Sequence, residues 1–225
     1  VYLLTHPSVI ETVIKRLRMF VLRSKVTLEN VSAEYDISGF VGADALTNQV
    51  NVQSADLSRL GILAAVEPIT ERPLAREIRI QPTRNTPAEK NDELWQWLNI
   101  RAGLAYVTAD ISEMFVPQML NLDRIGGVNF KKGCYPGQEI VARSHYLGKL
   151  KRRMQSASIQ FADEAARDAA YAQLRVGMDV FSSADPTQAA GQLIAYARHP
   201  FNHTQVDVLY EISLPLLEND ATLSF

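Results

Sequence analysis

The stretch from Gly177 to Ile212, GMDVFSSADPTQAAGQLIAYARHPFNHTQVDVLYEI, contains three strand-like segments separated by turn residues. These segments span 177–183, 192–198 and 206–212, and a fourth, 150–161, precedes them. Short strands at such spacing, with turn signals between them, are typical of a small antiparallel barrel or sandwich. We therefore predict that residues 148–225 form a small antiparallel β-barrel with one helical insertion at 163–174.

Upstream of this region, strand and helix patterns interleave, which predicts α/β or α+β packing, and we expect the chain as a whole to be α+β. Ser8 and Glu11 have the spacing of a capping box at the start of an amphipathic helix, and Gly103 is a suitable residue to end a later one. Helices are expected at 8–23, 42–50, 88–102 and 136–146. Strands are expected at 26–31, 35–41, 62–66 and 76–80, with loops at 81–91 and 115–133. We place a domain boundary near residue 147, so the expected domains are 1–147 and 148–225.

The composition is that of an ordinary globular protein. Of 225 residues, 47% are hydrophobic and 21% are charged, which excludes collagen-like and wholly disordered chains. No apolar run approaches the ~18 residues that a membrane helix needs. The single cysteine, Cys134, excludes an intramolecular disulfide and a four-cysteine metal site, so we expect a reducing compartment, the cytoplasm. Because the chain opens on Val1 without a signal-peptide pattern, we expect a fragment that lacks an N-terminal part.

Positive charge is concentrated in one window. The net charge is −2, but residues 131–153 contain seven Lys or Arg residues and one acid, Glu139. Such a basic patch suits a polyanion such as RNA, a phosphate, or a ligand that carries carboxylates. The alternative is an ordinary solvated strand, since Leu150 and Met154 interleave with the cations.

Within this window lies Lys131-Lys132-Gly133-Cys134-Tyr135-Pro136-Gly137-Gln138-Glu139. The two lysines before Cys134 and the helix expected after it both favour a thiolate, which predicts a reactive cysteine. His145 is a candidate base only if the fold brings it near. A buried structural cysteine in a turn is the alternative, because free cysteines are among the most buried residues.

Trp95 and Trp97 share a predicted helix and point to different sides of it. Leu94, Leu98 and Ala102 form one stripe with Trp95 at its margin, so Trp95 is a candidate to line a pocket and to stack on a flat heteroaromatic ligand. Two partly buried packing aromatics are the alternative. No metal site is expected, because Pro200 separates the only i, i+4 histidine pair, His199 and His203.

The segment Lys132-Gly133-Cys134-Tyr135-x-Gly137-Gln138-Glu139 strongly resembles the signature of the YgfZ family of folate-binding proteins. Two segments before it extend the resemblance, Pro117-Gln118-Met119-Leu120-Asn121-Leu122 and Gly126-Gly127-Val128-x-Phe130. Farther upstream, it includes Trp95-x-x-Leu98-Asn99-Ile100-x-Ala102-Gly103 and the opening helix with Ser24-Lys25-Val26. It covers most of the chain up to about residue 155.

The resemblance implies a fold similar to the T-protein of the glycine cleavage system. It implies a folate cofactor, tetrahydrofolate or a derivative, and an accessory role in assembly or repair of iron–sulfur enzymes, including those that thiomethylate tRNA. Trp95 resembles the folate-contacting tryptophan, Cys134 the functional thiol, and Tyr135 a further ligand contact. The expected partners are folate, iron–sulfur enzymes or their assembly factors, and tRNA through the window 131–153.

One position departs from the T-protein pattern. T-proteins carry a folate-contacting acid where this chain has Arg101, and a guanidinium offers only donors to a pterin ring. Aminomethyl transfer is therefore doubtful, although Arg101 suits a glutamate tail. We expect an accessory protein rather than an enzyme, with a tetrahydrofolate-dependent one-carbon transferase as the alternative.

Overall fold

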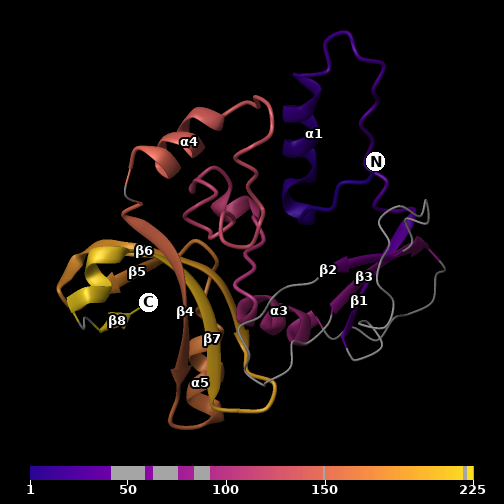
Figure 1. Cartoon of the computed structure of the whole chain (residues 1–225). Coiled ribbons are helices and arrows are strands. Elements are labelled where there is room, and N and C mark those ends of the chain that lie inside the picture. Colours follow the sequence, from indigo (N-terminus) through magenta and orange to yellow (C-terminus); the bar gives the residue numbers. More distant parts are fainter. Residues whose placement is uncertain (42–58, 63–75, 84–91, 149, 220–221, 225) are drawn as a thin grey trace. The chain divides into compact units, whose positions relative to one another are not determined.

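The computed structural model describes residues 1–41, 59–62, 76–83, 92–148, 150–219 and 222–224 (Figure 1). The chain forms two compact units, Val1–Asn91 and Asp92–Phe225. The boundary predicted near residue 147 falls inside the second unit, so the segment with Cys134 belongs to the same unit as the C-terminal strands. The helix predicted at 42–50 lies outside the described residues, as do residues 63–66 of a predicted strand and residues 84–91 of a predicted loop.

The first unit opens with a 3-10 turn, η1 (Pro7–Val9), and the helix α1 (Ile10–Arg18). The predicted helix is confirmed, but it ends at Arg18 rather than near Arg23. The predicted capping box is wrong: the N-cap of α1 is Val9, which makes no side-chain cap. Instead, the His6 ring accepts a hydrogen bond from the Ser8 N–H and so caps the preceding turn.

Three antiparallel strands complete the described part of the first unit. They are β1 (Tyr35–Val41), β2 (Arg59–Ile62) and β3 (Arg76–Pro82), in the order β1-β3-β2. Ile37 lies opposite Ile80 in the register, and Arg79 lies over the Phe40 ring. The strand predicted at 26–31 is wrong. Its β-branched residues pair with no described strand, and β-propensity reflects packing against neighbours rather than backbone preference alone.

The second unit contains a curled antiparallel sheet, a half-barrel, in the strand order β4-β7-β6-β5-β8 (Figure 1). Its strands are β4 (Arg152–Gln160), β5 (Asp179–Ser182), β6 (Asp185–Arg198), β7 (Gln205–Ser213) and β8 (Leu223–Ser224). The four predicted strands are confirmed, with β6 starting earlier than expected. The mixture of helices and antiparallel sheet agrees with the predicted α+β class. Gly191 lets β6 approach β7, because a Cβ there would overlap the Glu211 carbonyl oxygen.

The remaining elements of the second unit are helices and turns. The predicted insertion is the helix α5 (Glu164–Tyr171), which Asp163 caps by accepting a 2.8 Å bond from the Ala166 N–H. The others are α3 (Asp92–Arg101), η2 (Ala109–Ile111), α4 (Gln138–Tyr146) and η3 (Leu214–Asn219). Residues 115–133 form turns without a regular element, as predicted.

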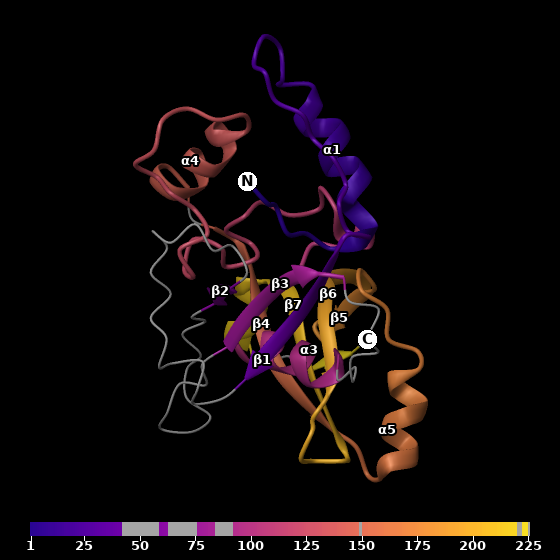
Figure 2. The ribbon, with the colours of Figure 1, turned by 90° about the vertical axis from the view of Figure 1, so that its right-hand side faces the viewer.

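The helix α3 packs across β6 and β7 (Figure 2). Gly103 ends it with a φ of 62°, and the Leu104 N–H reaches the Asn99 carbonyl, which is a Schellman motif. Leu98 and Ile100 of α3 join Met154, Ile194 and other buried residues in one core. This packing fixes the helix that carries both tryptophans. Among the described residues, no helix has the length and apolar character to cross a membrane.

Candidate functional site

Cys134 lies in an irregular segment that leads into α4, and it is exposed. The alternative of a buried structural cysteine is therefore wrong. Lys131, Lys132 and Gly133 before it are exposed as well, while Tyr135 after it is half-buried. The thiol is thus open to solvent and to a partner, between residues that are themselves held in place.

Asn129 holds the start of this segment. Its side-chain oxygen accepts hydrogen bonds from the backbone N–H groups of Lys131, at 2.8 Å, and Lys132, at 3.1 Å. The Lys132 ammonium then lies 4.5 Å from the centre of the Tyr135 ring. This distance is that of a cation–π contact, so the Lys132 charge and the Tyr135 ring bracket Cys134 in the sequence.

Gly137 and Gln138 hold the other end. Gly137 is the N-cap of α4 with a φ of 81°, a left-handed conformation that glycine adopts readily. The Gln138 side-chain oxygen accepts a 3.1 Å hydrogen bond from the Tyr135 N–H, and the Gln138 backbone N–H donates to the Tyr135 carbonyl at 3.2 Å. Pro136 lies before the cap, so the helix predicted at 136–146 begins two residues later, at Gln138. Glu139 pairs with Arg143 on the surface of α4 at 2.9 Å.

His145 does not act as a partner of Cys134 in the described contacts. Its ring stacks on Phe130 with 3.8 Å between ring centres and 18° between planes. Deeper in the unit, buried Gln118 donates a 2.6 Å hydrogen bond to the Val141 carbonyl. Phe130 and Gln118 thus attach α4 and the Cys134 segment to the turns at 115–133. The family signature therefore coincides with a defined local structure.

The two tryptophans of α3 have different environments. Trp97 is buried, and its Nε1–H donates a 2.6 Å hydrogen bond to the carboxylate of Asp207. Trp95 is half-buried, so part of the residue is exposed to solvent. Packing thus accounts for Trp97, and Trp95 remains the candidate for stacking.

Arg101 ends the same helix. Its Nε is buried and has no hydrogen-bond partner in the described part of the chain. An unsatisfied buried donor on a cation is costly, so the site suits an anion such as a carboxylate. Arg101 lies six positions after Trp95, which places the two residues about 9 Å apart along the helix axis and about 120° apart around it. Only an elongated ligand would therefore reach both Trp95 and Arg101. Tyr135, the third predicted ligand contact, is not on α3 but in the segment around Cys134.

The basic window 131–153 is less available than its sequence indicates. Arg152 forms two hydrogen bonds with fully buried Glu211, at 2.7 and 2.8 Å, and Arg153 binds Asp123 at 2.9 Å. The hydrogen bonds to Glu211 raise the pKa of Arg152 against the opposing effect of its burial. Burial alone would raise the pKa of Asp123, but the hydrogen bonds and charge of Arg153 lower it. Lys149 lies outside the described residues.

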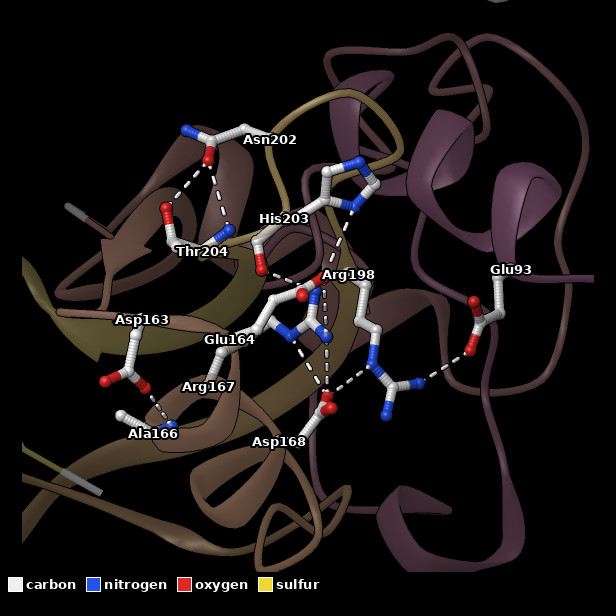
Figure 3. Close-up of polar contacts among 10 residues, drawn as sticks. All are labelled: Glu93, Asp163, Glu164, Ala166, Arg167, Asp168, Arg198, Asn202, His203 and Thr204. Atoms are coloured by element: carbon white, nitrogen blue, oxygen red, sulfur yellow. Dashed lines mark hydrogen bonds and ion pairs between the residues drawn. The ribbon is translucent and has the colours of Figure 1, made fainter.

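A second polar network, which sequence reasoning missed, ties α3, α5 and β6 together (Figure 3). The Arg198 guanidinium binds Glu93 at 2.7 Å and Asp168 at 3.2 Å. Arg167 also binds Asp168, at 2.8 Å, and it donates to the His203 carbonyl. The hydrogen bond from Arg167 lowers the pKa of Asp168. Desolvation opposes this effect, and the hydrogen bond from Arg198 lowers the pKa further. These ion pairs hold α3 against α5 and β6, which is a structural role.

His199 and His203, which the sequence analysis rejected as a metal-binding pair, make other contacts. His199 Nδ1 accepts hydrogen bonds from the backbone N–H groups of Phe201 and Asn202, and the His203 ring faces Glu164 at 3.7 Å. No group of three or more His, Cys, Asp or Glu residues in the described ranges is arranged to hold a metal ion.

Comparison with known proteins finds relatives that share one name, tRNA-modifying protein YgfZ. The relative from Colwellia psychrerythraea is 34% identical over 166 residues, 68% of this chain and 51% of the relative. That from Escherichia fergusonii is 33% identical over 162 residues, 65% of this chain and 49% of the relative. A relative from an Enterobacter species is 48% identical over 64 residues, 28% of this chain and 20% of the relative. The chain thus spans about half the length of the first two relatives, and no family model matches it.

Proposed function

Because this chain is homologous to the YgfZ tRNA-modifying proteins and consistent with a member of that family, we propose that it is a folate-binding accessory protein. In this proposal it supports assembly or repair of iron–sulfur enzymes in the cytoplasm, and thereby tRNA thiomethylation. We further propose a T-protein-like architecture for the whole protein. The observation that carries the proposal is the exposed Cys134 thiol in a segment held on both sides by specific hydrogen bonds.

The proposed chemistry of Cys134 is transient. A single thiolate can be one ligand of an iron–sulfur cluster, but such clusters ordinarily need four protein ligands. A solvent-accessible thiol can instead bind or transfer a group for a short time and then release it. This role needs access to a partner, which the exposure of Cys134 provides.

The residues of α3 suit parts of a folate. Half-buried Trp95 would stack on the flat heteroaromatic ring, and the unpartnered Nε of Arg101 would donate to a carboxylate of the glutamate tail. A reduced folate supplies one-carbon units when it is bound. The donors of Arg101 do not suit the pterin ring itself, which counts against an aminomethyltransferase.

A direct contact with tRNA is the lesser part of the proposal. Three of the seven cations in the window 131–153, Arg143, Arg152 and Arg153, form ion pairs with carboxylates. This leaves Lys131, Lys132 and Lys151 as the exposed lysines of this window among the described residues. A contact through them would weaken steeply with salt.

Folate binding is tested by tryptophan fluorescence, since the chain has only two tryptophans. Titration of the protein with 5-formyltetrahydrofolate should quench part of its emission. The variant Trp95→Phe should lose this quenching and bind more weakly in calorimetry, whereas the matched control Trp97→Phe should keep both. Unchanged quenching and affinity in Trp95→Phe, or no binding by the parent protein, would overturn the folate site on α3.

A further inference from the structure

The outward face of α4 carries exposed apolar side chains. Ile140 is 60% exposed, and Leu147, which directly follows the helix, is 84% exposed. Positions i and i+7 lie on the same side of a helix, so Ile140 and Leu147 share a face. The inner side is occupied, because Val141 is buried and His145 stacks on Phe130.

Exposed apolar residues are common on protein surfaces when they are scattered singly. Here, Ile140 and Leu147 lie within eight residues of each other and share a face. Tyr146, although 67% exposed, packs edge-on against the Phe130 and His145 rings and is not part of this face. Burial of each such side chain against a partner would be favourable, since its apolar surface leaves water. The attachment of α4 by Gln118 and Phe130 already fixes its orientation, so binding would not have to order it.

The charges around this face are positive. Lys131 and Lys132 are exposed in the preceding segment and supply the net positive charge, because Arg143, on the Ile140 side of the helix, is offset by Glu139. Glu139 is the only acid in α4, and it pairs with Arg143. A complementary surface would therefore have an apolar groove with an acidic rim.

We propose that α4 and Leu147, here called the α4 face, dock into an apolar, acid-rimmed groove on a partner protein. This inference rests on the proposed function, because it assigns to the Cys134 thiol the surface that brings it to its client. Cys134 lies four residues before α4, and in Figure 1 α4 leads on toward β4 of the same unit. Docking of the α4 face would therefore hold the thiol beside the partner.

A protein partner fits these observations better than RNA does. Aliphatic Ile140 and Leu147 gain little from a hydrated phosphate backbone, whereas an apolar groove would bury them. The nearby cations are also few, since Arg143 is already paired. Nucleic-acid surfaces usually present many cations, because phosphate contacts provide much of the affinity.

The functional test uses a strain that lacks the gene, restored with the full gene carrying Ile140→Ser and Leu147→Ser together. We expect tRNA thiomethylation to fall about tenfold or more, consistent with loss of two buried aliphatic contacts. The matched control is Phe201→Ser, which removes another exposed apolar side chain, 81% exposed, from the β6–β7 connection. Thermal melting and the alkylation rate of Cys134 should be unchanged in both, which separates docking from folding and from thiol chemistry.

The partner class is tested by a photo-crosslinking amino acid at position 147, with position 201 as the control site. The proposal expects a crosslink to a protein that is lost when Ile140→Ser is added, together with the loss of thiomethylation. A crosslink to RNA or to a second copy of this chain, no crosslink, or normal thiomethylation by the double variant would overturn it. Cys134→Ala is measured in parallel: if it alone fails, docking is wrong and the thiol role stands, whereas its full activity would refute the thiol role itself.

Discussion

Trp97 and Asp207, 110 residues apart in the sequence, are joined by a 2.6 Å hydrogen bond inside the second unit. The other oxygen of the Asp207 carboxylate accepts from Ser158 at 2.6 Å and from Gln205 at 2.7 Å. The buried carboxylate is thus satisfied by side chains from α3 and from the sheet. This contact fixes the rotation of α3 and leaves Trp95 at the edge of the packed face.

Replacement of Trp97 by Phe should destabilise the protein. The variant keeps an aromatic ring but removes one donor from buried Asp207, which should cost about 1–3 kcal/mol. Urea unfolding measures the loss, and Trp95→Phe is the control that leaves Asp207 satisfied. Equal stability of the two variants would show that the hydrogen bond contributes little.

Removing only Arg152 from its ion pair with Glu211 should destabilise the protein more than removing both partners. Arg152→Met leaves the Glu211 carboxylate buried without its guanidinium, which should cost about 3 kcal/mol. The double variant Arg152→Met/Glu211→Leu should recover much of that loss, because no uncompensated charge remains. A single variant as stable as the parent protein would mean that water or another cation replaces Arg152.

Gly137 should tolerate substitution less well than Gly133. A Cβ at either position meets no atom within 4 Å, but only Gly137 has a positive φ, 81°. Gly137→Ala should therefore cost about 1–2 kcal/mol from backbone strain alone, and Gly133→Ala should be close to neutral. Unfolding curves for both variants, with hydrogen exchange of α4 amides, measure the difference. Equal effects would contradict the assigned role of Gly137 at the start of α4.

The Asp168 cluster predicts a pH dependence. Hydrogen bonds from Arg167 and Arg198 place the pKa of Asp168 below its ordinary value of 3.8. Its contribution to stability is therefore present above pH 3.8 and is lost as the pH falls through the lower folded value. The difference in melting temperature between the parent protein and Asp168→Asn should be constant near neutral pH and shrink in acid. A difference that stays constant down to pH 3 would argue against the lowered pKa.

Local sequence patterns predicted the parts of the fold that depend on residues close together in the sequence. The β4 strand, whose burial largely alternates, and the β7 strand, which is buried along most of its length, follow from their side-chain patterns, and the Gly103 helix end follows from backbone conformation. The strand at 26–31 was wrong because strand formation depends on a partner elsewhere. The early end of α1 at Arg18 likewise depends on contacts beyond the helix, such as the bond from Arg18 to the Leu28 carbonyl.

The candidate site shows the same division. The signature around Cys134 was visible in the sequence. The exposure of Cys134 in the structure then excluded the alternative of a buried structural cysteine. The sequence did not reveal that Arg152 pairs with Glu211 and Arg153 with Asp123, because these partners lie 59 and 30 residues away. It also missed the Arg198 cluster, whose members come from α3, α5 and β6. Long-range ion pairs have no local signal, so the sequence overstates how many cations of the basic window are available to a ligand.

The central claim is that Cys134 is a working thiol. Its most direct test restores a strain that lacks the gene with the full gene carrying either Cys or Ala at position 134, and quantifies thiomethylated tRNA. With equal protein levels and equal melting temperatures, the account predicts that the Ala variant fails to restore the modification while Cys restores it. Full restoration by Ala would contradict the claim and would leave the segment a role in shaping the surface rather than in thiol chemistry.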